Sequence, residues 1–205
     1  MVLLQFVAGL IVLITHIILA HLLYKQKAEE IEMKQNFTTW MLAGVIDSFL
    51  AFLSIKNGNE FSTLMEASST FLPLFYAIGS FITAGVLLYK KIYSWTWWDT
   101  IITVIVLICI FIWIEAGDYT AIIVGIIAST ISFIPQIRDT NEKPHETPFI
   151  FYFFFLLGDS LCFIGEFVGG NEFTVKGSLF SFTEILLSLI IIFLVLFIKF
   201  KKIKN

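Results

Sequence analysis

Carboxyl groups inside long apolar runs are the side chains of this sequence most able to do chemistry. Asp47 and Asp159 each lie about ten residues into such a run, and Glu184 lies somewhat less deep in another. A carboxylate near the centre of a bilayer costs roughly 2.5–3.5 kcal/mol on insertion scales, and no Lys or Arg lies near the middle of a run to neutralise it. These acids therefore either carry a proton or meet a cation in a watered cavity, and both outcomes suit the binding of an ion or a polar solute.

The alternative is a protonated carboxyl that only hydrogen-bonds a neighbouring helix and holds the helices together. Asp47 and Asp159 occupy related positions in an internal repeat, and helix association alone explains such a pair poorly. Binding is therefore the favoured interpretation for these two, while for Glu184 both interpretations stay open. We expect the acids near the outer ends of the runs to be solvated: Glu66, Glu115 and Glu166.

His16 is a candidate proton relay, because it lies midway along the first apolar run and an imidazole exchanges protons near neutral pH. A single hydrogen bond to another helix explains it slightly better. His21 follows five residues later, which is not the i, i+4 spacing of a helical metal pair. The sequence predicts neither a metal site nor a cofactor. It holds no nucleophile–base arrangement and no phosphate loop, so we expect no enzyme, and no basic patch suggests nucleic acid as a partner.

Prolines mark candidate hinges. Pro135 lacks an N–H and clashes with the carbonyl of Ile131, so the helix around it should bend, and Gln136 can bond to freed backbone groups. A gate and a static kink explain this pair equally well. Pro73 can bend another run in the same way.

The elements that carry these residues must be membrane helices. The chain has 205 residues, of which 58% are hydrophobic and 14% charged, too apolar for a soluble globular domain. A bilayer core takes about 20 helical residues. The sequence contains seven apolar runs of that order: Val2–Tyr24, Phe37–Ile55, Ala67–Tyr89, Trp97–Ile114, Tyr119–Ile137, Pro148–Val168 and Gly177–Ile198.

Basic residues predict the orientation of these runs. Of the 13 Lys and Arg, only Lys56 and Lys176 fall on one side. By the positive-inside rule, the N-terminus is outside and the C-terminus is cytoplasmic in the cell (inner) membrane. The other eleven fall on the cytoplasmic side: Lys25, Lys27, Lys34, Lys90, Lys91, Arg138, Lys143, Lys199, Lys201, Lys202 and Lys204. An aromatic belt is expected at the same interface: Tyr89, Tyr93, Trp95, Trp97 and Trp98.

An internal repeat relates the two ends of the chain. The dipeptide Asp-Ser at 47–48 and the tetrapeptide Gly-Asn-Glu-Phe at 58–61 recur 112 residues later, at 159–160 and 170–173. Because three helices are an odd number, a second unit keeps the orientation of the first only if one extra helix intervenes. The prediction is an all-α integral membrane protein with seven transmembrane helices in a 3+1+3 parallel repeat: units 1–92 and 118–205, joined by a linker helix within 93–117.

The segment from Gly125 to Thr140, which contains Pro135-Gln136 and precedes a short polar loop and another helix, resembles the PQ-loop motif. That motif belongs to a superfamily that holds SWEET and SemiSWEET sugar transporters and cystinosin-like exporters. The resemblance covers essentially the whole chain. Leu19 and Ala20 replace the motif in the first unit, and Cys162 stands where the sugar-transporting branch typically has an aromatic residue. We therefore expect asymmetric gating and not a typical sugar site.

These observations and the resemblance together favour a transporter that moves a small polar solute by alternating access, either coupled to protons or specific for a cationic, amino-acid-like substrate. A SWEET-like sugar uniporter is one alternative, and a ligand-binding receptor or sorting protein on the same scaffold is another. The expected partners are the small-molecule substrate, the lipid bilayer and protons. The sequence leaves open whether the chain forms a homo-oligomer.

Overall fold

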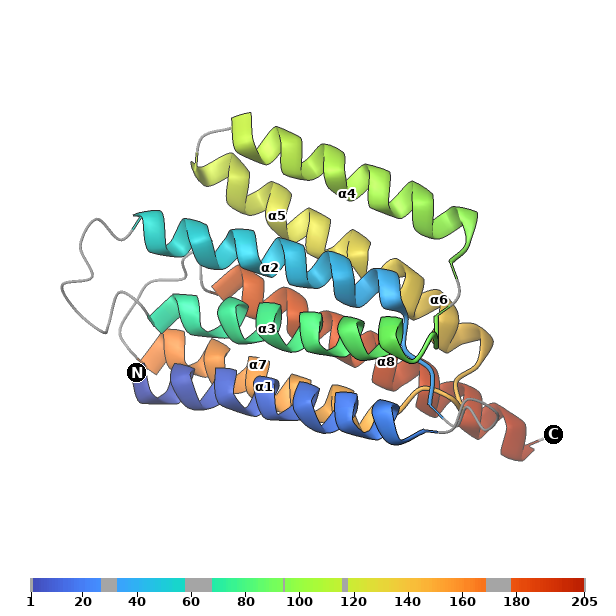
Figure 1. Ribbon diagram of the computed structural model, residues 1–205. Helices are drawn as coiled ribbons and strands as arrows, with labels where there is room; N and C mark the ends of the chain where they lie inside the picture. Colours follow the sequence, from blue (N-terminus) through green and yellow to red (C-terminus); the bar gives the residue numbers. More distant parts are fainter. Residues whose placement is uncertain are drawn as a thin grey trace.

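The described part of the chain is built from helices packed side by side (Figure 1). The computed structural model describes residues 2–26, 33–57, 68–93, 95–115, 118–168 and 178–204. No β-strand occurs among these residues. The helices are α1 (Val2–Lys25), α2 (Phe37–Asn57), α3 (Ser68–Tyr89), α4 (Trp97–Glu115), α5 (Asp118–Ser132), α6 (Ile134–Glu142), α7 (Phe149–Val168) and α8 (Ser178–Lys204).

The fifth apolar run is divided into two helices, α5 and α6. The break is at Phe133, two residues before Pro135, which lies in the first turn of α6. The prolyl nitrogen cannot donate a hydrogen bond, so the chain ends one helix and starts another there. The helix predicted to end at Ile137 therefore continues to Glu142, in a separate and largely polar segment. Pro73, in contrast, lies inside α3 without dividing it.

Each end of the chain contributes a group of packed helices. α3 packs against both α1 and α2, and α8 packs against α7, α5 and α6. Between the groups, α1 contacts α7 and α2 contacts α5. α4 packs mainly on α5 and lies with it along one edge of the bundle in Figure 1. The buried core is continuous across these contacts and includes Ile46, Leu72 and Ile191.

Apolar side chains cover the outside of the bundle, and polar side chains lie within it. Leu107, Phe111 and Phe193 are each more than half exposed, whereas the three acids singled out from the sequence are at most 4% exposed. This distribution is the reverse of that of a water-soluble protein and suits a lipid environment.

Within the described residues, five helices are long and apolar enough to cross a membrane: Leu3–Lys25, Phe71–Tyr89, Trp97–Glu115, Phe149–Glu166 and Leu179–Ile198. α2 has a shorter apolar stretch, Phe37–Phe52, and α5 has 15 residues before its break. An all-α membrane protein is therefore the fold class, and the count of seven spans stays a prediction. The aromatic residues expected as a belt are all exposed: Tyr89, Tyr93, Trp95, Trp97 and Trp98.

Candidate functional site

A buried group of carboxyls lies between the two helix groups. Asp159 on α7 is fully buried, and the hydroxyl of Tyr76 on α3 lies 2.9 Å from its Oδ1 and 3.0 Å from its Oδ2. Tyr76 therefore donates to this carboxyl from the other helix group. A tyrosine hydroxyl that spans both oxygens stabilises a carboxyl group that water cannot reach.

Glu184 on α8 is the second member of this group. Its Oε1 lies 2.8 Å from the hydroxyl of Ser129 on α5, and both side chains are buried. Ser129 thus fixes the position of Glu184 from the neighbouring helix. This contact lies one turn before Phe133, at which α5 ends.

Asp47 on α2 completes the group. It interacts electrostatically with both Glu184 and Asp159, so the acids predicted from the sequence come together from three helices. Asp47 is 3% exposed, and its Oδ1 has no hydrogen-bond partner among the described residues. Asp47 is therefore the one carboxyl of the three with a buried oxygen still available to a ligand.

His16 on α1 is surrounded by aromatic rings, and one of them belongs to Tyr76. Its ring centroid is 4.9 Å from that of Trp40, 5.8 Å from Tyr76 and 4.7 Å from Phe155. Its Nδ1 lies 3.1 Å from the hydroxyl of Thr83, which supplies the predicted bond between helices. The close approach of α3 requires Gly79, because a Cβ there would lie 2.4 Å from the imidazole.

Aromatic rings continue from this enclosure toward the end of the bundle that holds α6. Trp40 contacts Phe155 and Phe133, with centroids 5.9 and 6.2 Å apart. The indole of Trp40 and the hydroxyl of Tyr152 both donate to Oε1 of Gln35, each at 3.0 Å. These side chains form a packed aromatic layer that joins α2, α7 and the break between α5 and α6.

Beyond the aromatic layer lies an inner polar cluster, in which Gln136 is fully buried. Its Oε1 accepts from the backbone N–H of Asn36 at 2.8 Å, and its Nε2 lies 3.3 Å from the hydroxyl of Thr140. The side-chain amide of Asn36 also donates to Asp139 at 2.8 Å. Gln136 thus bonds a backbone group at the start of α2, whereas the sequence suggested the groups that Pro135 frees in its own helix.

Arg138 extends the inner polar cluster to α4. Its guanidinium donates to Oδ1 of Asp139 at 2.9 and 3.1 Å and lies 3.6 Å from Oδ2 of Asp99. A third N–H donates to the hydroxyl of Thr96 at 3.0 Å. The backbone N–H of Thr96 donates to Asp99 at 2.8 Å. The cluster therefore ties α2, α4 and α6 together.

Sequence reasoning missed Asn36, Asp99 and Asp139, because polar residues at helix ends are usually solvated. Two signals were available. Asn36 directly precedes α2, and its Oδ1 accepts from the N–H of Thr39, as an N-cap does. Thr96 and Asp99 have the spacing of a capping box before an apolar run.

Glu166 was expected to be solvated, and this expectation was wrong. It is 5% exposed and accepts a hydrogen bond from Nε2 of Gln5, which joins α7 to α1. The contact between these helices, near the start of α1, covers the carboxyl. Glu115 is exposed as expected, while Glu66 and both copies of Gly-Asn-Glu-Phe lie outside the described residues.

Known proteins supply no identity for this arrangement: no family model, no curated protein and no solved structure matches the chain. Within the described residues, no group of three or more His, Cys, Asp or Glu side chains has a geometry that could hold a metal ion. The carboxyls and the layers around them are therefore the features that bear on function.

Proposed function

We propose that the chain is a membrane transporter that moves a small polar solute by alternating access, with Asp47, Asp159 and Glu184 as its central binding site. The observation that carries the proposal is the burial of these three carboxyls, from three helices, inside a bundle with an apolar exterior. Such groups are costly within a membrane, and they commonly mark ion or substrate pathways.

A proton or a cationic group is the ligand chemistry that suits this site. No Lys or Arg is among the described groups that act electrostatically on the three carboxyls. Tyr76 and Ser129 supply only neutral donors. A bound ammonium group would offer up to three N–H donors and would offset the mutual repulsion of the acids. A site built for a neutral sugar would not need this excess of acid.

The layers on one side of the site are suited to act as its inner gate. The aromatic layer around Trp40 and the inner polar cluster around Gln136 lie between the carboxyls and that end of the bundle. The break at Phe133 lets α6 move relative to α5. Pro135 has no backbone N–H and donates no helical hydrogen bond, so no such bond has to break. In this account Pro135 is the hinge and Gln136 is part of the latch. Pro73, inside the undivided α3, has no such role.

We further propose the 3+1+3 arrangement and membership of the PQ-loop superfamily. The repeat makes α5 and α6 the counterpart of α1, α7 the counterpart of α2, and α8 the counterpart of α3. The helix contacts support it, since α3 and α8 each pack against both other members of their unit. The contact of α1 with α7 and that of α2 with α5 are equivalents under the same relation. The distribution of Lys and Arg supports a cytoplasmic C-terminus.

Uptake into proteoliposomes tests the transport function. Purified chain would be assayed with a panel of radiolabelled amines, amino acids and sugars, with and without a pH gradient. We expect uptake of a cationic or proton-coupled solute, and a loss of about tenfold or more in Asp47→Asn and in Asp159→Asn, because a hydrogen bond to a charged group contributes about 1.5–3 kcal/mol.

Other outcomes of this experiment separate the rival functions. Glu115→Gln, which removes one exposed carboxyl and leaves both the central carboxyls and the inner polar cluster intact, serves as a control for charge removal elsewhere. Uptake of a neutral sugar that ignores the pH gradient and both central variants would favour a uniporter. Saturable binding without net flux would favour a receptor.

A further inference from the structure

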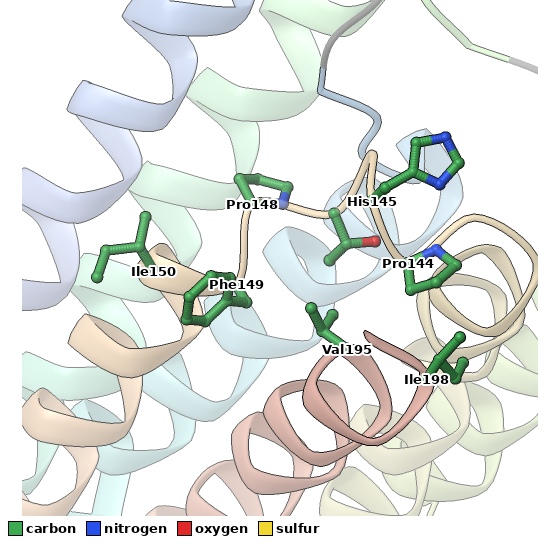
Figure 2. Close-up of a pocket in the computed structure, with 8 residues that line it drawn as sticks. Pro144, His145, Pro148, Phe149, Ile150, Val195 and Ile198 are labelled. Atoms are coloured by element: carbon green, nitrogen blue, oxygen red, sulfur yellow. The ribbon is translucent and has the colours of Figure 1, made fainter. Parts of the chain in front are cut away.

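Figure 2 shows a pocket whose lining includes none of the three central carboxyls. It has a volume of about 320 Å³ and lies between the loop that leads into α7 and the last turns of α8. Figure 2 shows Val195 and Ile198 projecting from α8 toward the loop. The remaining lining residues are Pro144, His145, Thr147, Pro148, Phe149 and Ile150.

The lining of this pocket is mainly apolar, with His145 and Thr147 as its polar side chains. Ile150 is 48% exposed and the side chain of His145 is 70% exposed, so the pocket reaches the outside of the bundle. A volume of about 320 Å³ is at the lower end of the range for ligand pockets, roughly 300–1,000 Å³, and is too small for a whole phospholipid. It suits part of one hydrocarbon chain.

Positive charge follows immediately in the sequence. α8 continues to Lys204, and Lys199 and Lys202 come four and seven residues after Val195, the spacing that returns to one side of a helix. No acidic residue occurs after Glu184. In the loop, Lys143 pairs with Glu146 at 3.1 Å, so the loop adds little net charge. The end of α8 is therefore the cationic part of this region.

We propose that this pocket binds one anionic phospholipid, with part of an acyl chain between α7 and α8 and its phosphate near the lysines that end α8. Lysines at the end of a membrane helix attract anionic headgroups, and an adjacent apolar pocket adds a chain contact that a free anion cannot make. The site also adjoins the inner polar cluster, because the hydroxyl of Thr147 lies 3.1 Å from that of Thr140. The proposal does not depend on transport.

Native mass spectrometry of the purified chain in detergent tests this site, with phosphatidylglycerol and phosphatidylcholine of identical acyl chains as probes. We expect one phosphatidylglycerol to bind in preference to phosphatidylcholine. The double variant Lys199→Gln, Lys202→Gln should weaken phosphatidylglycerol binding by about 25-fold, since each lysine near an anionic surface contributes about 1 kcal/mol, or roughly fivefold. Ile150→Trp, at a half-exposed position, should weaken both lipids by filling the pocket.

A matched double variant, Lys90→Gln with Lys91→Gln, removes the same charge after the end of α3. If phosphatidylglycerol binding falls equally in this control, the lysines of α8 act only through nonspecific electrostatic attraction. That result would overturn the proposal. Equal binding of the two lipids would also overturn it, as would full competition by glycerol phosphate, which has no acyl chains. Both lysines belong to the last two turns of α8, so we expect their replacement to leave folding intact, which gel filtration checks.

Discussion

The three central carboxyls are held differently, and this difference assigns them different roles. Asp159 has a tyrosine donor and Glu184 a serine donor, whereas Asp47 retains a buried oxygen without a partner among the described residues. A buried acceptor without a donor is costly unless a ligand or a proton satisfies it. In the proposed mechanism Asp47 therefore contacts the transported cation or proton most directly, and Tyr76 and Ser129 position the other two carboxyls.

The first prediction at the residue scale concerns Tyr76→Phe. Loss of the hydroxyl leaves the buried Asp159 without its donor, which should lower the stability of the purified protein by about 1–3 kcal/mol. The thermal unfolding midpoint in detergent measures this. Transport should fall as well, in the same assay as for the aspartate variants.

Tyr152→Phe is the matched control, because this tyrosine is equally buried. Its partner Gln35 keeps the indole of Trp40 as a donor, so the loss should be smaller. Equal shifts of the unfolding midpoint in the two variants would mean that the hydrogen bond from Tyr76 to Asp159 stabilises the protein no more than the bond from Tyr152 to Gln35.

Sequence alone supported part of this site. Asp47 and Asp159 stand out because each is an acid in an apolar run and both recur at a fixed offset. Their partners could not be predicted, since Tyr76 and Ser129 are ordinary residues whose role depends on how neighbouring helices are aligned. The burial of Glu166 was missed for the same reason. Its hydrogen-bond donor, Gln5, is 161 residues away in the chain.

Among the helices, α4 has more than a connecting role. Its first turn carries Asp99, which is fully buried and lies 3.6 Å from Arg138 of α6. α6 is also bonded to the start of α2 through Gln136 and Asn36. The expected linker helix is thus fastened to the segment that follows the break at Phe133, so any opening of the inner gate has to separate this contact.

A double-mutant cycle tests this contact between elements. Asp99→Asn and Arg138→Gln should each lower the unfolding midpoint, and the two effects should couple by about 0.5–3 kcal/mol because the groups are in one network. The control cycle uses Lys143→Gln and Glu146→Gln, a pair at 3.1 Å in which the lysine is 52% exposed. Exposed pairs contribute about 0–1 kcal/mol. Additive effects of the two substitutions would mean that Asp99 and Arg138 do not stabilise each other, and would contradict their role in holding the inner gate closed.

The sequence predicted the elements better than their interruptions. Apolar length located the described helices other than α6, since burial or lipid contact demands such runs. The bend at Pro135 was expected, but the separate helix to Glu142 was not, because a polar stretch such as Ile134–Glu142 is stable only when neighbours bond its side chains. Those neighbours are far away in the sequence.

In the described part of the molecule, polar side chains lie inside the bundle and apolar side chains cover its outside, as expected for a protein in a membrane. Five helices in the described part of the chain have the length and composition to cross a membrane, and the central carboxyls lie where the two helix groups meet. The aromatic layer and the inner polar cluster lie on one side of the carboxyls. Rocking of the two groups about the carboxyls would open that side and close the other, which is the central claim of the proposed mechanism.

Access to Ser129 from each side of the membrane tests this claim most directly. Ser129 lies 2.8 Å from Glu184 and is 2% exposed, and Ser129→Cys changes little else in a background with Cys109→Ala and Cys162→Ala. A small, impermeant methanethiosulfonate reagent would be added to oriented vesicles from one side or the other. The account predicts modification from both sides, with the rates shifted in opposite directions by a transported substrate. Modification from a single side, unchanged by substrate, would contradict it.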